Sequence, residues 1–227
     1  MRNRNLLYLA LSLAMLAAYP AHALEVGLRD DFQDGTTQGW EVGEFSPNPP
    51  VNDVGGGGNR FLHVTSRGGQ GPGSRLSVFN IGKQWTGNYT EAGISALSAQ
   101  AANFGDTDVE LRLLLADPQG VGQIPENIAI TTEAIHLPAG SDWTTAVFSI
   151  APENLTVLEG DVETLLSGVT ELRFFHNPAP DFPPPPEGPP PIVAAVGIDD
   201  VTAIPEPATA LLLAIGAGGL IRRRRRA

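Results

Sequence analysis

The sequence contains no cysteine. This absence excludes disulfide bonds, thiol catalysis and thiolate metal sites together. A folded domain in this chain must therefore depend on its apolar core, and on any bound cation, for its stability. Aromatic residues are also few, at 7% of the chain, so each exposed aromatic side chain would be a notable feature of the surface.

Positive charge is scarce in the middle of the chain. The whole sequence carries a formal net charge of −11, but seven of its 14 basic residues lie near the two ends. Between them, seven basic and 24 acidic residues leave a charge of about −17. So acidic a surface repels phosphate backbones, and nucleic acid is excluded as a partner. Divalent cations and neutral, hydroxyl-rich ligands suit it better.

Recognisable catalytic motifs are missing as well. The three histidines beyond the N-terminal region are His63, His136 and His176, and none lies in a zinc-binding or nucleophile motif. A glycan hydrolase would need only two carboxylates about 5–10 Å apart. With 24 acidic residues some pair always fits this requirement, so pairing by itself predicts nothing. We expect no catalytic residues and no enzyme activity.

Residues 1–23 have the pattern of a cleavable signal peptide. Arg2 and Arg4 provide a positive start, Leu6 to Ala18 is an apolar run, and Ala21-His22-Ala23 supplies small residues at the cleavage site. The alternative is an N-terminal membrane anchor, but the run is short and the helix-breaking Pro20 precedes the cleavage motif. The sequence predicts export.

The C-terminal region has three parts in a fixed order. Pro205-Glu206-Pro207 is followed by the uncharged run from Ala208 to Ile221, and then by the arginine cluster Arg222, Arg223, Arg224, Arg225 and Arg226. A helix of this length covers about 21 Å, whereas the hydrocarbon core of a bilayer is about 30 Å thick. The segment can therefore pause in a membrane with its arginines on the cytoplasmic side. The alternative is a plain tail anchor.

This tripartite end, over about residues 204–227, resembles the PEP-CTERM sorting signal of Gram-negative envelope proteins. The resemblance implies recognition of Pro205, Glu206 and Pro207 by an exosortase, cleavage near them, and release to the cell surface or beyond. The implied partners are the secretion machinery, signal peptidase, the exosortase and, transiently, the inner membrane through residues 208–221. Such proteins tend to occur in species that make exopolysaccharide and biofilm.

The intervening domain, residues 24–203, shows short β-rich runs separated by turn residues. We expect strands at residues 61–65, 75–80, 109–116, 128–137, 144–150, 170–176 and 193–202, and a short helical piece from Asn154 to Leu166. The proline-rich segment 177–191 is expected to be a stiff surface loop. These spacings predict an all-β fold, an antiparallel jelly-roll or immunoglobulin-like sandwich, flanked by a signal helix and a short C-terminal apolar helix.

The two ends of this domain favour the jelly roll. Asp31-Phe32-Gln33-Asp34-Gly35 with Gly39-Trp40 resembles the first strand of carbohydrate-binding modules and galactose-binding-like domains. The closing Ile198-Asp199-Asp200-Val201 resembles the last strand of the same group. Trp40 and Trp143 fit core positions, because each lies among alternating apolar residues.

First and last strands of a jelly roll usually lie side by side, which would gather five carboxylates, those of Asp30, Asp31, Asp34, Asp199 and Asp200. Clustered carboxylates repel each other unless a cation neutralises them, and calcium accepts six to eight oxygens in irregular geometry. In the resembling modules a structural calcium lies at about this place. Gln33 stands where many relatives have glutamate, which removes one charged ligand. The alternative is a set of solvated aspartates at strand ends and turns.

Sugar rings commonly stack on flat aromatic side chains. Trp85 and Tyr89 lie close together in a polar stretch of the sequence and are the candidate glycan platform; the alternative is that they pack in the core or at its rim. We therefore expect an exported protein that associates with surface polysaccharide, with calcium as its one candidate cofactor. A purely structural matrix protein is the main alternative, and a glycan hydrolase comes last.

Overall fold

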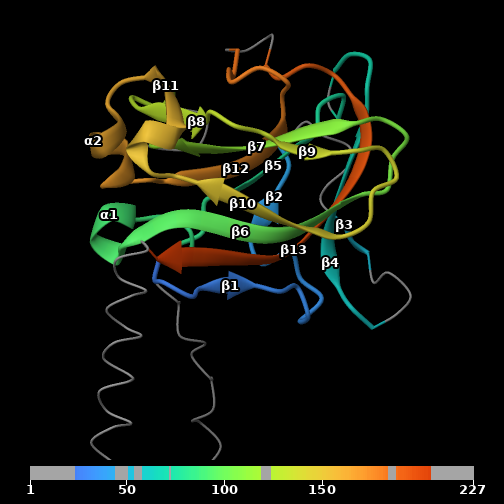
Figure 1. Cartoon of the computed structure of the whole chain (residues 1–227), viewed down its shortest axis with the longest axis horizontal. Helices are drawn as coiled ribbons and strands as arrows, with labels where there is room; N and C mark the ends of the chain where they lie inside the picture. The colour runs from blue at the N-terminus through green and yellow to red at the C-terminus, as the bar shows by residue number, and fades with distance from the viewer. Residues whose placement is uncertain are drawn as a thin grey trace, which may run out of the picture.

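The computed structural model describes residues 24–43, 51–53, 58–71, 73–118, 124–183 and 188–205, with backbone alone for 51–53. Within these ranges the chain forms two sheets packed face to face, with few helical residues (Figure 1). The predicted signal peptide, Glu206, Pro207 and the predicted sorting segment beyond them lie outside the described residues. None of the described helices is long and apolar enough to cross a membrane.

The first sheet has the strand order β10-β6-β13-β4-β3, and β1 also pairs with β13. All its described pairings are antiparallel. Its strands are β10 (Thr144–Ser149), β6 (Ile94–Asn103), β13 (Val193–Pro205), β4 (Phe61–Arg67), β3 (Val51–Asp53) and β1 (Arg29–Asp30).

The second sheet has the order β11-β8-β7-β12-β5-β2, and β9 also pairs with β7. Its strands are β11 (Leu155–Glu159), β8 (Ile128–Thr131), β7 (Val109–Ala116), β12 (Glu171–His176), β5 (Ser77–Asn80), β2 (Trp40–Glu41) and β9 (Ile135–Leu137). Two short helices, α1 (Tyr89–Ala92) and α2 (Val162–Leu166), and the 3₁₀ turn η1 (Pro152–Asn154) lie at one end of the sandwich (Figure 1).

The core lies between the sheets and follows the two-residue period of the strands. In β4, Leu62 and Val64 point inward and are buried, while Phe61, His63 and Thr65 alternate with them on the outer face. Each fully buried apolar side chain of this size contributes about 1.5–3 kcal/mol. The alternation therefore fixes which face of the first sheet is exposed, because a one-residue slip would reverse every side chain.

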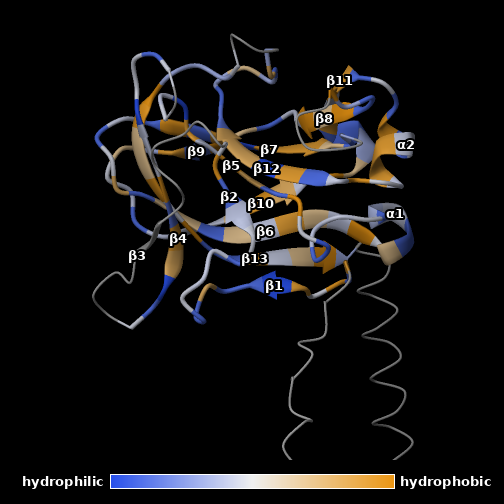
Figure 2. Cartoon of the chain, turned by 180° about the vertical axis from the view of Figure 1, so that it is seen from behind, coloured by the Kyte–Doolittle hydropathy of each residue, from blue (hydrophilic) through white to orange (hydrophobic). Residues whose placement is uncertain are grey.

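The second sheet differs because successive residues of β7 and β8 are buried, so both of its faces are covered there. Figure 2 shows these two strands largely in the hydrophobic colour. Leu114, Ile130 and Phe175 form a smaller cluster on its outer side, separate from the main core. Phe182, from the proline-rich segment, packs its ring edge-on against Phe175, with the ring centroids 5.1 Å apart. The proline-rich segment thus helps to cover the outer face of the second sheet.

The proline-rich segment connects β12 to β13, as the sequence predicts, and its described parts are firmly held. The buried Arg112 guanidinium donates hydrogen bonds to the carbonyl oxygens of Asn177 and Pro178 at the beginning of the segment. At its end Arg75 donates to the carbonyl oxygen of Pro189 at 2.6 Å. The segment therefore crosses from one sheet to the other between two arginine contacts.

The first and last strands of the domain lie side by side, as expected. Arg29 pairs with Thr202 and Asp30 with Val201, and the amide of Gly27 donates to the carbonyl oxygen of Ala203. Figure 1 shows β1 running beside β13 along the lower edge of the sandwich. The N-terminal end of the domain therefore lies next to the end of β13 at Pro205.

Two expectations about secondary structure are wrong. The helix expected from Asn154 to Leu166 is instead β11 followed by the five-residue helix α2, because Leu155 to Glu159 pairs with β8. The ten-residue strand β6 was not predicted at all. Its sequence is rich in alanine and serine, which have little β-propensity, and neighbouring strands on both sides hold it extended.

Candidate functional site

An aromatic cluster lies on the outer face of the first sheet. We use this name for Phe61 and His63 of β4, Phe104 after β6, and Trp143 before β10. The ring centroids of Phe61 and Trp143 are 5.1 Å apart, and those of Phe104 and Trp143 are 5.8 Å apart, both edge-on. Phe104 is 46% exposed and Trp143 37% exposed. Because these rings are contiguous rather than scattered singly, they are a candidate contact site.

A glycine of β13 makes room for this cluster. Gly197 pairs with His63 on one side and Ala102 on the other. A Cβ atom at this position would lie 2.7 Å from Cη2 of Trp143 and 2.8 Å from Cε2 of Phe104. Because such approaches are closer than van der Waals contact, the rings can lie over β13 only if residue 197 has no side chain.

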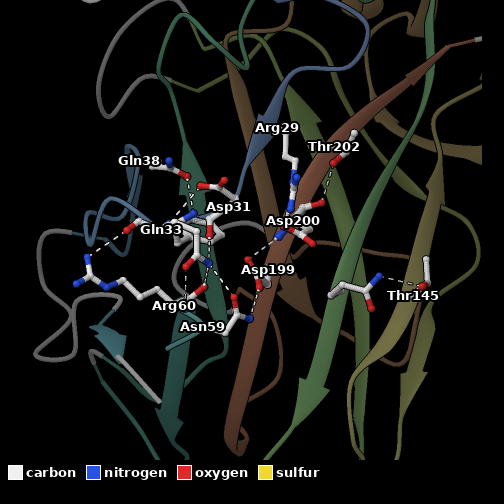
Figure 3. A network of polar contacts seen from close by, with 12 residues as sticks. Arg29, Asp31, Gln33, Gln38, Asn59, Arg60, Thr145, Asp199, Asp200 and Thr202 are labelled. Atoms are coloured by element: carbon white, nitrogen blue, oxygen red, sulfur yellow. Dashed lines mark hydrogen bonds and ion pairs between the residues drawn. The ribbon is translucent and has the colours of Figure 1, made fainter. Parts of the chain in front are cut away.

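A row of polar side chains lies next to the aromatic cluster on the same face. Asp199 is two residues after Gly197 and pairs with Gln100 of β6, which in turn pairs with Thr145 of β10. The Gln100 side chain donates to Thr145 Oγ1 at 3.0 Å. Asn59 donates to Asp199 Oδ2 at 2.8 Å, and Figure 3 shows these two side chains facing each other. We call Asn59, Gln100, Thr145 and Asp199 the polar row.

Asp199 is held firmly in this row. Its side chain is largely buried, and burial raises the pKa of its carboxyl group above the ordinary value. The hydrogen bonds from Asn59 and from the amide of Asp200 oppose that rise in pKa. The fixed Asp199 carboxylate therefore orients Asn59, while the exposed Thr145 and the half-buried Gln100 are the polar side chains of the row that a ligand hydroxyl group can reach.

The predicted glycan platform is wrong. Trp85 and Tyr89 are both fully buried in the main core. The Trp85 indole N–H donates to Asp30 Oδ2 at 2.6 Å, and the Tyr89 hydroxyl donates to the Trp85 carbonyl oxygen at 2.8 Å. Their polar neighbours in the sequence belong to turns that lead these rings inward, so neither ring can stack on a ligand.

The sequence also predicted core positions for Trp40 and Trp143, and this prediction is wrong for Trp143. Trp40 is fully buried, as predicted, but Trp143 lies on the surface. In β10, Ala146 and Phe148 point inward, so Trp143 shares the outward parity of Thr145 and Val147. That parity was the signal in the sequence that could have identified Trp143 as an exposed side chain.

The five aspartates of the predicted calcium site come near one another but face different partners. Asp30 points into the core, where its Oδ2 accepts hydrogen bonds from the indoles of Trp40 and Trp85. Asp34 accepts from Thr36 and Asp31 from the amide of Gln33. Asp199 accepts from Asn59, and Asp200 forms an ion pair with Arg29 (Figure 3).

Among the described residues, no group of three or more histidine, aspartate or glutamate side chains is arranged to hold a metal ion. Calcium at the first and last strands therefore stays a prediction, and it would require Asp199 and Asp200 to leave their present partners. If calcium binds there, a chelator such as EDTA should lower the thermal midpoint of the protein, and an unchanged midpoint would show that the site holds no calcium. Differential scanning calorimetry with and without EDTA, followed by added calcium, measures this. A midpoint that falls with EDTA and recovers with calcium would show that the carboxylates rearrange around the ion.

Asp30 predicts a distinctive pH dependence of stability. Burial raises the pKa of its carboxyl group to about 6 from an unfolded value of 3.8, although two indole N–H groups oppose this. The folded state therefore binds the Asp30 proton more tightly than the unfolded state does. Protonation of Asp30 stabilises the folded state in full below about pH 4, and this stabilisation is lost as pH rises through 6. A shift of this size corresponds to about 3 kcal/mol.

We expect the free energy of unfolding of the wild type, relative to that of Asp30→Asn, to fall by up to about 3 kcal/mol between pH 4 and pH 7. The substitution keeps the size of the side chain and removes its titration, so carboxylates elsewhere in the chain cancel in the comparison. Urea unfolding of both proteins at several pH values measures the difference. Parallel stability curves would show that the Asp30 pKa is not raised.

The fold is similar to that of known sugar-binding modules. The family 11 carbohydrate-binding module of Clostridium thermocellum, solved with a β-1,3-1,4-mixed-linked tetrasaccharide, superposes with a TM-score of 0.50 at 11% identity, covering 79% of this chain and 96% of the module. An exo-β-agarase superposes with a TM-score of 0.53 at 14% identity, but the match covers 80% of this chain and only 26% of the agarase.

At these identities the similarity establishes the fold alone, a jelly-roll sandwich of the carbohydrate-binding-module type. A second agarase, AgWH50C, matches to the same extent, with a TM-score of 0.50 over 26% of its length. No protein-family profile matches the sequence, and no curated protein matches it either.

Proposed function

We propose that this chain is an exported, non-catalytic protein that binds neutral polysaccharide on the outer face of the first sheet. The observation that carries the proposal is the aromatic cluster beside the polar row. Exposed rings can contact the apolar faces of sugar rings, while the exposed Thr145 and the half-buried Gln100 offer donors and acceptors to their hydroxyl groups. Such a combination of apolar surface and few fixed polar groups is typical of small-ligand sites.

The charge of the domain supports a neutral ligand. The middle of the chain carries about −17, so uronic-acid or sulfated polysaccharides would be repelled. The similar module of Clostridium thermocellum was solved with a neutral β-1,3-1,4-linked tetrasaccharide, and the agarase similarity is consistent with a neutral glycan as well. We infer that surface exopolysaccharide of the producing cell is the natural partner.

Affinity electrophoresis tests the proposal. The purified domain is run through native gels that contain β-1,3-1,4-mixed-linked glucan, agarose or the producing cell's own exopolysaccharide, with alginate as the anionic control. We expect slower migration in at least one of the neutral gels and none in alginate. Unchanged mobility in every gel would favour a structural protein without a sugar site. Release of reducing ends from a retarding glycan would instead indicate a hydrolase.

We also propose that a PEP-CTERM system sorts the protein to the cell surface after a transient stay in the inner membrane. The support is the order of Pro205-Glu206-Pro207, apolar run and arginine cluster in the sequence. Pro205 is the last residue of β13, so the motif begins at the end of the last described strand. Mass spectrometry of the mature protein should find a C-terminus near residue 207 and an N-terminus near residue 24. A mature chain that retains Arg222 to Arg226 would overturn the processing step.

A further inference from the structure

A groove of about 1270 Å³ lies at the end of the sandwich that carries α1 and α2. Its lining comes from these two helices, from η1, and from the adjoining ends of β6, β10 and β13. The residues that matter here are Glu91, Ala96, Val147, Glu163, Ile204 and Pro205. None of them belongs to the aromatic cluster or to the polar row.

The groove is continuous with the sheet face that carries the proposed glycan site. Along β6 the small side chains of Ala102, Ser98 and Ala96 lie on this face together with Gln100. Ala96 pairs with Ser149, and both line the groove together with Val147, which pairs with Ser98. From Ala102 to Ala96 the strand rises about 20 Å, at about 3.4 Å per residue.

The chemistry of the groove suits a neutral chain rather than an anion. Among the described residues that line it there is no lysine, arginine or histidine, and there are three glutamates, Glu91, Glu153 and Glu163. Carboxylates accept hydrogen bonds from hydroxyl groups, and Val147, which is 50% exposed, offers an apolar contact. Of the described lining residues only Tyr89 is aromatic, and its ring is buried, so it cannot stack on a ligand.

We propose that the groove is a second subsite for the same neutral polysaccharide. The chain would run parallel to β6, from the aromatic cluster across the polar row to the α1–α2 end of the domain. This inference rests on the proposed function, because it assigns the far end of the same ligand. Two linked subsites make the second contact intramolecular, so a long oligosaccharide must bind more tightly than a short one.

Isothermal titration with short and long ligands tests the subsite. The probes are a disaccharide and an octasaccharide of β-1,3-1,4-mixed-linked glucan, or of agarose if agarose is the polymer that retards the domain. We expect the octasaccharide to bind at least about tenfold more tightly than the disaccharide. Val147→Lys, which fills the path between the subsites, should weaken octasaccharide binding about fivefold or more and leave disaccharide binding unchanged.

Two further variants separate the possible results. Val157→Lys is the matched control, since Val157 is a 42% exposed strand residue on β11 of the second sheet, and it should bind both probes as the wild type does. Glu163→Gln removes one carboxylate of the groove without changing its shape, and should also weaken the octasaccharide selectively. It serves in place of Val147→Lys if that variant fails to fold.

The outcomes distinguish failure of the second subsite from failure of the proposed polysaccharide-binding function. Equal affinity for the disaccharide and octasaccharide, or an octasaccharide affinity that neither groove variant lowers, overturns the second subsite and leaves the proposed function intact. Absence of binding to either probe, with no retardation in any glycan gel, overturns the proposed function itself. Binding of an oligolysine peptide that Glu163→Gln weakens, without any effect on glycan affinity, would assign the groove to a basic partner and overturn the subsite.

Discussion

Alanine in place of Trp143 is expected to weaken polysaccharide binding by about thirtyfold or more, since truncating an anchoring tryptophan in a contact site costs about 2 kcal/mol or more. The Trp143 ring is 37% exposed and packs edge-on against Phe61 and Phe104. Its removal would therefore take away a ligand contact and also loosen the two rings that it orients. The main core lies on the other face of the sheet, so the thermal midpoint should change little.

Affinity electrophoresis and calorimetric melting of the same preparations measure both effects. Val157→Ala is the matched control, because it truncates another exposed strand residue on the opposite sheet and should alter neither value. Gly197→Leu provides an independent test: its Cβ would meet the Trp143 and Phe104 rings at less than 3 Å and push them away from β13. If Trp143→Ala retained full affinity, the aromatic cluster would not be the binding surface.

The sequence and the structure agree most closely where a strand is apolar on the inside. The strand at residues 109–116 was predicted with its observed bounds, because leucines fill both faces of β7 and leave no other environment for it. The strand that precedes it in the chain, β6, was missed for the opposite reason. Leu97 and Ala99 point inward, but alanine, serine and glutamine cover the rest, and only the pairing with β10 and β13 makes this stretch a strand.

The candidate site was harder to predict than the fold, because its residues come from separate segments. Phe61, Phe104 and Trp143 are far apart in the sequence and meet only through the register of three strands over Gly197. A glycine within a strand gives a weak local signal. The polar surroundings of Trp85 in the sequence pointed to exposure, whereas its environment in the fold is set by Asp30 and by the core.

The carboxylates of the predicted calcium site show a further reason why the site was harder to predict than the fold. The sequence correctly placed the first strand beside the last, and thus Asp30 near Asp199 and Asp200. It could not show which way each side chain points. Asp30 turns inward to two indoles, whereas Asp200 turns to Arg29, and the positive φ of 52° at Asp200, where the register of β13 shifts, is part of that divergence.

Alanine in place of Trp85 is expected to lower the free energy of unfolding by about 3–5 kcal/mol, the usual range for removing a large buried aromatic side chain. Trp85 is fully buried beside Trp40, with their ring centroids 6.4 Å apart, and its N–H is one of two donors to the Asp30 carboxylate. The substitution would leave a cavity and also weaken the solvation of a buried charge. Urea unfolding at pH 7 measures the loss, with Trp143→Ala as the control that should cost less than about 1 kcal/mol.

Trp85→Phe separates the effect of the cavity from the effect of the lost hydrogen bond to Asp30. Phenylalanine refills most of the space but donates no hydrogen bond, so at pH 7 it should cost about 1–3 kcal/mol, the penalty for leaving a buried acceptor short of a partner. Because the protonated carboxyl group of Asp30 depends less on that donor, the cost should shrink as pH falls below 6. A cost that stays the same between pH 4 and pH 7 would mean that packing alone holds Trp85. The indole of Trp85 would then have no part in keeping Asp30 charged at the centre of the sandwich.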